Sequence, residues 1–264
     1  MPKLQENRRR YTPFSMSPRL AFAIDSAYRA GRSTLAHFNT GVSVESKMDN
    51  SPVTVADRDA ERMIRDDIAK IFPGEAILGE EEGGASEGDR WVIDPIDGTK
   101  SFIAGVPLYA TLLSFESDGE PQLGVCYFPA LDEMLFAEKG GGAFWNGRPC
   151  RVSNRSQLSG STISCGGHSS MVRAGRDESF GSIVGEALVT RTWSDAYGHA
   201  LVATGRIDGM VDPIVSPWDI SAMALIVRES GGTFTDFAGG AALAGEAISS
   251  NGKIHEFLLE AFRT

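Results

Sequence analysis

The spacing of apolar side chains predicts a chain in which helices alternate with short strands. Ser17-Pro18 is typical of a helix start, because serine caps free N–H groups and proline suits the first helical position. Apolar residues then recur at helical spacing and predict a helix over residues 18–38 that Gly41 ends. A second helix is expected between Asp57 and Pro73-Gly74. Further helices are expected over 178–187, around 200–203, from 217 to the glycines at 231–232, and over 255–262.

Short apolar runs bounded by glycine, proline and polar residues predict the strands. They lie at residues 76–78, 91–93, 111–115, 123–128, 133–137, 143–145, 162–165, 207–212 and 233–235. The stretch 166–168 is expected to be a turn, and His168 within it is either a substrate contact or an ordinary loop residue. These elements together predict an α+β protein.

Composition narrows the class of protein. The 264 residues are 42% hydrophobic, which suffices for a large core in one domain or in two closely joined lobes. The net charge of −10 argues against general nucleic-acid binding. Three cysteines without metal-like spacing indicate reduced thiols in a cytoplasmic protein. No apolar run reaches the length that crosses a membrane.

The first residues of the chain are expected to stand apart from the fold. Residues 1–16 predict a disordered arm. The arm holds Arg8-Arg9-Arg10 but no apolar run follows, so it does not match a secretory signal. An organelle transit peptide is the alternative interpretation.

The richest chemistry lies in residues 91–102, where a short apolar run leads into two aspartates. Pro95 stands between Asp94 and Asp97 and favours a turn. Such a turn aims both carboxylates at one point and brings the Ile96 carbonyl beside them. The motif therefore offers hard oxygen ligands for a metal ion, although an acidic surface turn after a strand would look the same.

Gly98 and Thr99 follow these aspartates directly. Glycine permits a close backbone approach, and the residues after it are expected to open a helix. Free N–H groups and partial positive charge at a helix N-terminus suit a phosphate. The same motif thus offers a metal site and a seat for an anion.

Three other acidic positions have both a structural and a chemical interpretation. Glu80 directly follows a buried strand, but residues 80–82 are also typical of a solvated loop. Asp57 stands three positions after Thr54, a spacing that predicts a capping box and does not exclude catalysis. Asp219 opens a helix and is either a metal ligand or an N-cap.

If these carboxylates converge, they would raise one another's pKa values unless cations compensate. An all-oxygen ligand set selects Mg²⁺ or Mn²⁺ over zinc or copper. The pattern predicts metal-dependent phosphomonoester hydrolysis, in which Thr99 beside Asp57 orients a water and the Gly98 and Thr99 N–H groups hold the phosphate. The converging set would be Glu80, Asp94, Asp97 and Asp219, with Asp57 close by.

Residues 94–99 resemble the signature of the inositol monophosphatase family. Two further motifs and a flexible loop with its water-activating aspartate match in order: 79–81, 218–219, and Asp57 preceded by Lys47 and 51–54. The resemblance spans about residues 20 to 260. It implies a layered α/β/α/β/α sandwich, commonly a homodimer and often inhibited by lithium. It also implies one phosphatase domain over 17–264, with a metal and phosphate lobe to residue 150 and a substrate lobe from residue 151.

The resemblance also implies the ligand set. Glu80, Asp94 and the Ile96 carbonyl would bind a first Mg²⁺. Asp94, Asp97 and Asp219 would bind a second, and Glu80 would support a weaker third. Two to three ions per site are therefore expected, with Mn²⁺ as a substitute. Asp97, Gly98, Thr99 and Asp219 would also face the phosphate or the substrate.

Two stretches in the last third of the chain indicate which phosphate ester is the substrate. Asp195 lies within 192–199, and Asp212 lies seven positions before Asp219. Both stretches resemble the histidinol-phosphate phosphatase branch, although His199 replaces an expected tyrosine. Extra carboxylates would favour a substrate that carries an ammonium and an imidazole. In the structural interpretation, Asp195 is a helix cap and Asp212 a turn residue.

L-Histidinol phosphate is therefore the expected substrate, and histidine biosynthesis the expected role. The alternatives are an inositol-1-monophosphatase, a broad-range sugar or nucleotide phosphatase of the same family, and a non-catalytic regulatory protein on this scaffold. Expected partners are a small phosphate ester and a second copy of the chain, without nucleic acid or membrane.

Overall fold

The structure is a computed structural model that describes residues 16–46, 52–85, 87–241, 243 and 245–263. Residues 1–15 of the expected arm, and Lys47 and Ser51 of the expected flexible loop, lie outside this range. The helices are α1 (Pro18–Thr34), α2 (Val55–Ile71), α3 (Thr99–Ile103), α4 (His168–Arg173), α5 (Asp177–Glu186), α6 (Asp195–Ala203), α7 (Pro217–Glu229) and α8 (His255–Phe262).

The strands form three sheets within the described residues. A small hairpin pairs β1 (Val44–Ser46) with β2 (Pro52–Thr54). The remaining strands are β3 (Ala76–Gly79), β4 (Gly83–Gly84), β5 (Arg90–Asp97), β6 (Ala110–Ser117), β7 (Glu120–Phe128), β8 (Glu133–Glu138), β9 (Gly142–Trp145), β10 (Arg148–Pro149), β11 (Thr162–Cys165), β12 (Val189–Arg191), β13 (Gly209–Val215), β14 (Thr233–Thr235) and β15 (Gly245–Ser250).

The larger sheet has the strand order β10-β9-β8-β7-β6-β5-β3-β4. Its pairs are antiparallel except for β3 and β5, which run parallel. The smaller sheet has the order β12-β11-β13-β15-β14, with β11 parallel to both of its neighbours. Because β3 and β5 are parallel, their C-terminal ends lie at the same edge of the sheet. Glu80 directly follows β3, and Asp97 is the last residue of β5.

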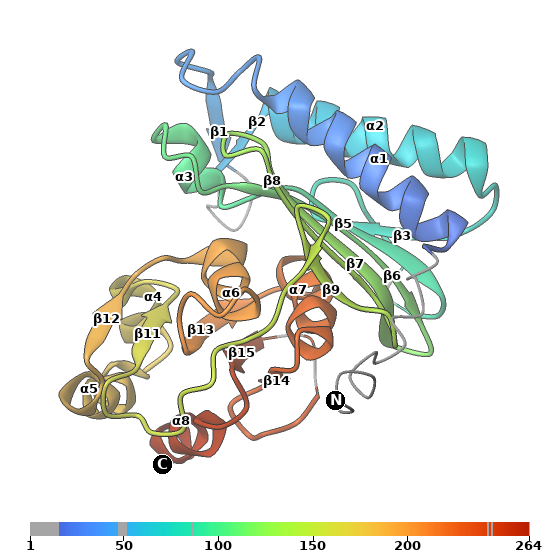
Figure 1. The fold of residues 1–264 in the computed structure, drawn as a ribbon. Coiled ribbons are helices and arrows are strands. Elements are labelled where there is room, and N and C mark those ends of the chain that lie inside the picture. The colour runs from blue at the N-terminus through green and yellow to red at the C-terminus, as the bar shows by residue number, and fades with distance from the viewer. Residues whose placement is uncertain (1–15, 47–51, 86, 242, 244, 264) are drawn as a thin grey trace, which may run out of the picture.

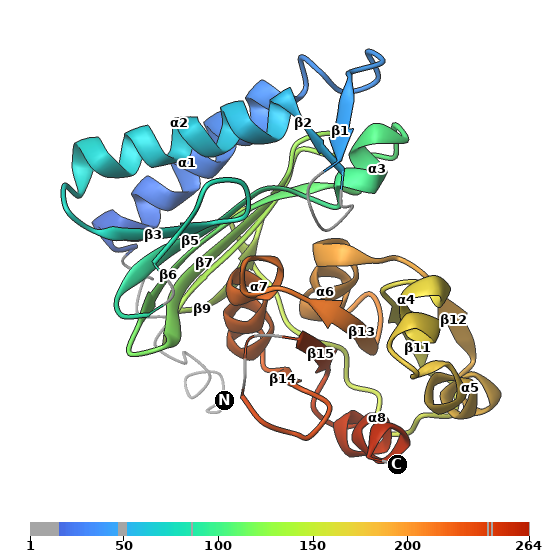
Figure 2. The ribbon, with the colours of Figure 1, turned by 180° about the vertical axis from the view of Figure 1, so that it is seen from behind.

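The elements stack in layers (Figure 1). Helices α1 and α2 cover the outer face of the larger sheet, whereas α6 and α7 lie between the two sheets, and α4, α5 and α8 lie beyond the smaller sheet. Each interface has its own apolar core, with Leu20, Ile64 and Trp91 in the first, Met223 and Met210 in the second, and Leu258 in the third. This arrangement confirms the expected α+β, layered α/β/α/β/α sandwich (Figure 2). The expected division into lobes at residue 150 stays a prediction.

Helix α7 packs directly on the larger sheet because β7 has a glycine beneath it. A Cβ built on Gly124 would lie 2.6 Å from the carbonyl oxygen of Ala222. One position earlier, the buried Ser221 hydroxyl donates to Glu116 Oε1 at 2.7 Å. These contacts set the depth of the helix whose first turn holds Asp219.

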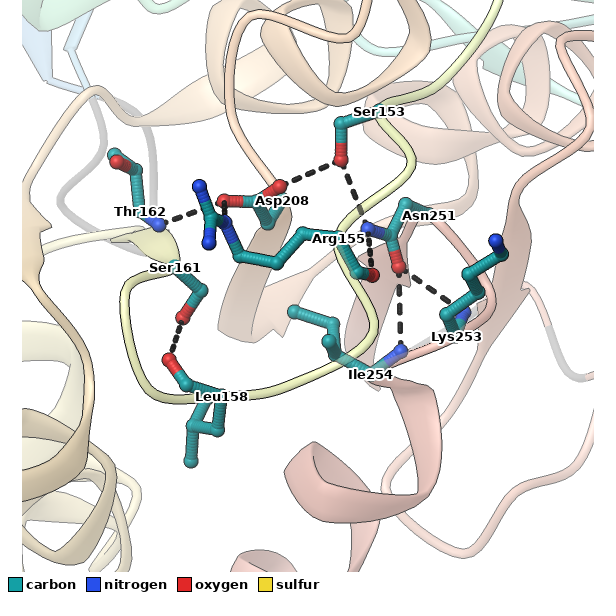
Figure 3. A network of polar contacts seen from close by, with 9 residues as sticks. All are labelled: Ser153, Arg155, Leu158, Ser161, Thr162, Asp208, Asn251, Lys253 and Ile254. Atoms are coloured by element: carbon teal, nitrogen blue, oxygen red, sulfur yellow. Dashed lines mark hydrogen bonds and ion pairs between the residues drawn. The ribbon is translucent and has the colours of Figure 1, made fainter.

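The connection between the sheets is fastened to the smaller one (Figure 3). Asp208, just before β13, accepts a hydrogen bond from Ser153 Oγ at 2.5 Å. Asn251, just after β15, donates to Ser153 Oγ at 2.8 Å and to the Arg155 carbonyl at 2.9 Å. Residues at the ends of two strands of the smaller sheet, β13 and β15, therefore bind the connecting segment at the same place.

Several element boundaries differ from the sequence-based expectations. Ser17 caps α1 as predicted, with Oγ accepting from Leu20 N at 3.1 Å, but the helix ends at Thr34 and gives way to turns. The turn expected at 166–168 runs into helix α4, and strand β15 was not predicted. Among the described residues, no helix combines the length and apolar character needed to cross a lipid bilayer. Each of the three cysteines is a free thiol.

Candidate active site

The two aspartates of the central motif come together because β5 carries a bulge. Side chains three positions apart in a regular strand point to opposite faces. Asp94 pairs with Leu112 and Asp97 pairs with Ala110, so three steps along β5 oppose two along β6. The extra residue reorients the strand. The expected turn is therefore a bulge inside a strand that continues to Asp97.

Local hydrogen bonds fix this bulge. Asp94 is buried, and its Oδ1 accepts from Ile96 N at 3.1 Å. Thr111 Oγ1 donates to the Pro95 carbonyl at 2.8 Å from the neighbouring strand. Thr99 Oγ1 donates to the Ile96 carbonyl at 3.2 Å. Ile96, whose carbonyl is expected to face a metal, is thus held at its N–H by Asp94 and at its carbonyl oxygen by Thr99.

Asp219 reaches the same point from the other side, through α7. It is the third residue of the helix and not its N-cap, so that expectation was wrong. Ser216 is the cap, and Asp219 Oδ2 completes the capping box by accepting from Ser216 N at 2.7 Å. Carboxylate oxygens of Asp94, Asp97 and Asp219 lie within 4.8 Å of one another. Capping leaves the second oxygen of Asp219 available for a ligand.

The electrostatics of this triad fit a bound cation. Burial, followed by the negative charges of Glu80 and Asp97, raises the pKa of Asp94 well above its ordinary value. Burial and the nearby carboxylate of Asp195 do the same to the pKa of Asp97. Burial, with Glu80 as the leading charge, raises the pKa of Asp219 to about 7. A divalent cation removes this repulsion, and an all-oxygen set suits a hard one.

Glu80 joins the triad from the end of β3. It lines a cavity of about 200 Å³ together with Asp94, Thr99 and Asp219. Its charge contributes to the raised pKa values of Asp94 and Asp219. The glutamate after the strand therefore faces the acidic cluster and is not simply part of a solvated loop.

Asp57 forms the predicted capping box at the start of α2. Its Oδ2 accepts from Thr54 N at 2.8 Å and from Thr54 Oγ1 at 2.6 Å. Its Oδ1 is buried and has no hydrogen-bond partner among the described residues. Burial raises the pKa of Asp57, and the charge of Glu80 raises it further. One oxygen is thus structural, and the other is left for a ligand. The expected contact with Thr99 stays a prediction, because the Thr99 hydroxyl is engaged with Ile96.

Gly98 needs to be glycine for two reasons. Its φ is +80°, which L side chains adopt at a cost, and it precedes the short helix α3. A Cβ there would lie 3.1 Å from Asp195 Oδ2. The predicted anion seat at Gly98 and Thr99 therefore faces the start of α6.

Asp97 links the larger sheet to helix α6 at this point. Its Oδ2 accepts from Ala196 N at 2.7 Å, which satisfies a free N–H of α6. Asp195 is the first residue of α6 and has a φ of +58°, a strained conformation for a residue with a side chain. Its Oδ2 accepts from Ser194 Oγ at 3.0 Å. Asp97, and not Asp195, therefore supplies the capping bond to this helix.

Asp212 lies inside β13 and not in the turn that the structural interpretation expected. It is 7% exposed, and burial raises its pKa well above the ordinary value, with further contributions from Asp195 and Asp219. Gly166 makes room for it, because a Cβ at that position would overlap Asp212 Oδ1. The β13 strand shifts register against β15 just after Asp212, as the two pairings on either side show.

A cavity of about 390 Å³ joins these groups. Asp97, Asp195, Asp212 and Asp219 line it together with Glu80. Sequence reasoning missed two cations in its wall, Lys100 and Arg173, and an apolar side formed by Ile214 and Trp218. Lys100 directly follows the central motif and could have been found there, whereas no local signal marks Arg173.

Of the two histidines His168 and His199, only His199 lines the larger cavity. His168 opens α4, which contributes Ser169, Ser170 and Arg173 to the cavity wall and not His168. His199 lines the cavity, and its Nδ1 lies 2.8 Å from Ser249 Oγ. Burial lowers its pKa to about 3, so the imidazole is neutral. Its Nε2 has no partner among the described residues.

Known proteins match this chain over nearly its whole length. Residues 15–264 match the inositol monophosphatase family. A histidinol-phosphatase of Chlorobaculum parvum is 44% identical over 227 residues, which is 85% of this chain and 88% of that protein. A Thermotoga maritima protein named fructose-1,6-bisphosphatase/inositol-1-monophosphatase is 40% identical, over 90% of this chain and 93% of that protein. Among solved structures, Thermotoga maritima IMPase matches with a TM-score of 0.86 at 36% identity, over 93% of this chain and 97% of that one.

Proposed function

Because this chain belongs to the inositol monophosphatase family, and is a phosphatase of that family, we propose that it hydrolyses L-histidinol phosphate with the help of Mg²⁺. The observation that carries the proposal is the shared cavity. Asp97 and Asp219 of the acidic triad line the same cavity as Asp195 and Asp212, which belong to separate elements of the second half of the chain. Asp94 lines the smaller cavity, which shares the walls at Asp97, Asp195 and Asp219. One part would hold the phosphate, and the other would recognise the alcohol.

The triad and its neighbours would hold the metal ions. Asp94 would be shared, with Glu80 and the Ile96 carbonyl on one side and Asp97 and Asp219 on the other. Bound Mg²⁺ would supply the positive charge that stabilises phosphoryl oxygens and lowers the pKa of water. Mn²⁺ is an expected substitute, because the same hard oxygen ligands suit it.

Asp57 and Thr99 would orient and deprotonate the attacking water. The buried Asp57 Oδ1 is the oxygen left to take a proton, since Oδ2 is engaged with Thr54. The Thr99 hydroxyl donates a hydrogen bond to the Ile96 carbonyl, so its oxygen can accept a hydrogen bond from water. The Gly98 and Thr99 N–H groups would hold the phosphate at the start of α3.

Asp195 and Asp212 would recognise the leaving alcohol. Histidinol carries an ammonium and an imidazole, and a nearby positive charge favours the ionised form of a carboxyl group. Binding would therefore oppose the causes that raise the pKa values of both aspartates. The apolar wall at Trp218 and Ile214 would accommodate the carbon skeleton and the imidazole ring.

A phosphate-release panel with added Mg²⁺ tests the proposal. The panel includes L-histidinol phosphate, inositol 1-phosphate, fructose 1,6-bisphosphate and a nucleoside monophosphate. L-Histidinol phosphate is expected to give the highest kcat/KM. A preference for inositol 1-phosphate by more than about tenfold, which is about 1.4 kcal/mol of transition-state binding, would overturn the choice of ester.

The second candidate is an inositol-1-monophosphatase or a fructose bisphosphatase. The 40% identical relative, whose name covers both activities, favours this candidate. Lys100 and Arg173 would suit the second phosphate of a bisphosphate. A non-catalytic regulatory protein is less well supported, because the complete carboxylate set is present. Absence of Mg²⁺-dependent activity across the panel would favour that reading. A cytoplasmic homodimer stays a prediction.

A further inference from the structure

Helix α2 holds a buried carboxylate that the proposed chemistry does not use. Glu61 is 0% exposed. Its Oε2 accepts from Glu81 N at 2.8 Å, and its Oε1 accepts from Glu82 N at 3.1 Å. Arg65, one turn further along α2, supplies the balancing charge through Nε, 2.8 Å from Oε1. These hydrogen bonds and the ion pair fix the buried Glu61 side chain in place.

The segment that Glu61 holds is the one that carries Glu80. The two N–H donors belong to the residues directly after Glu80, and Arg65 Nη2 reaches the Gly83 carbonyl at 2.5 Å. Before Glu80, a Cβ built on Gly79 would overlap Glu61 Oε1. The backbone on both sides of Glu80 therefore packs closely against the Glu61 carboxylate.

The same helix also carries Asp57. Glu61 lies four positions after Asp57, which places the two side chains on one face of α2. The electrostatic influence of Glu80 on the pKa of Asp57 indicates that the two carboxyl groups are near each other. Helix α2 thus joins the residue proposed to take the proton to the loop proposed to bind metal.

We propose that Glu61 is a positioning residue that holds the Glu80 loop in the geometry at which Glu80 and Asp94 bind a metal ion together. This inference rests on the proposed metal-dependent function. Glu61 contacts neither the phosphate nor the metal in this account, and it acts only through the backbone at Glu81 and Glu82. Arg65 supports it by neutralising its charge and by fixing the far end of the loop.

Direct metal binding to the full-length, metal-free protein tests this role. Isothermal titration calorimetry with Mn²⁺ gives a dissociation constant, and a melting curve of each variant reports stability. Glu61→Ala is expected to raise the Mn²⁺ dissociation constant about 10- to 100-fold, the range found when groups that orient metal ligands are removed. Glu61→Gln, which keeps one accepting oxygen, is expected to give a smaller rise.

Two further variants separate positioning from general stability. Gly79→Ala keeps Glu61 but displaces it, and should weaken Mn²⁺ binding in the same direction. Ile64→Val, in the apolar core one turn away on α2, should lower the melting temperature without changing the Mn²⁺ dissociation constant. Raising Mg²⁺ should restore the kcat of Glu61→Gln with an unchanged KM for the ester.

The outcomes are separable. If wild-type protein binds no Mn²⁺, the metal-dependent function fails. If wild-type protein binds Mn²⁺ and Glu61→Gln and Gly79→Ala bind it equally well, the positioning role is wrong and Glu61 is only a structural ion pair. Should Glu61→Ala not fold, these two milder variants decide the question alone.

Discussion

The candidate site has two acidic regions that differ in how the chain builds them. Asp94 and Asp97 come from one continuous motif, and a single bulge in β5 brings them together. Asp195 and Asp212 come from α6 and β13 in the second half of the chain, and only the tertiary fold makes them neighbours. In the proposed function, the first region would act on the bond that all phosphate esters share. The second would face the part in which esters differ.

Their electrostatics differ in the same sense. Burial is the leading cause of the raised pKa in both regions, and around Asp94 the further causes are other carboxyl groups. Asp195 has a cation nearby, because the charge of Lys100 partly lowers its pKa. The carboxyl groups of the first region therefore need an added cation to offset their mutual repulsion. Those of the second region could instead pair with a positively charged group of the substrate. Substitutions in the two regions should separate hydrolysis itself from the choice of ester.

The largest effect is expected at Asp94. Asp94→Asn should lower phosphate release about a thousandfold or more on every ester, because a shared metal ligand contributes several kcal/mol of charge stabilisation. Initial rates with L-histidinol phosphate, inositol 1-phosphate and p-nitrophenyl phosphate measure this. Asp118→Asn, at an exposed turn, serves as the control and should be silent. Unchanged release by Asp94→Asn would contradict the metal role of this region.

A smaller and selective effect is expected at Asp212. Asp212→Asn should raise the KM for L-histidinol phosphate about 10- to 100-fold, because a hydrogen bond to a charged group contributes about 1.5–3 kcal/mol. Hydrolysis of p-nitrophenyl phosphate should stay nearly constant, since that ester has no ammonium. Asp195→Asn should act in the same direction. An equal loss of kcat on all esters would show that both regions belong to the bond-breaking machinery.

The smallest effect concerns stability and pH. Asp219 has an ordinary pKa of 3.8 and a folded-state pKa of about 7, so the folded metal-free protein binds more protons between these values. The contribution of Asp219 to the stability of the metal-free protein should therefore fall as pH rises from about 4 to 7. The melting temperature of wild-type protein minus that of Asp219→Asn should decline by a few degrees across this range.

Subtracting the melting temperature of Asp219→Asn from that of wild-type protein removes the contribution of His199, which acts in the opposite direction. That imidazole is neutral when folded and protonates on unfolding below pH 6.5, so its contribution is lost as pH falls towards about 3. Added Mg²⁺ should stabilise wild-type protein most at pH 8, where the carboxyl groups are ionised. A melting difference independent of pH would contradict the raised pKa of Asp219.

Much of the first region could be predicted from the sequence because it is local. The apolar run before Asp94, the proline between the aspartates and Gly98 all act on their immediate neighbours. The capping box of Thr54 and Asp57 was predicted for the same reason. The bulge in β5 was not, because it depends on pairing with β6.

Asp195 and Asp212 of the second region were expected from the family resemblance, but their contacts escaped prediction because these join distant segments. The Asp97 bond to Ala196 N spans 99 positions, and no local pattern indicates which carboxylate satisfies α6. The strained backbone at Asp195 persists because surrounding packing enforces it, and propensity does not reveal it. No local pattern marks Glu61, since its partners lie 20 and 21 positions away.

The most direct test of the central claim is the phosphate-release panel, run first without metal and then with Mg²⁺. Metal-free protein should release no phosphate from L-histidinol phosphate. Added Mg²⁺ should start release, with a higher kcat/KM for this ester than for inositol 1-phosphate. Release that chelation leaves unchanged, or a more than about tenfold preference for inositol 1-phosphate, would contradict the account.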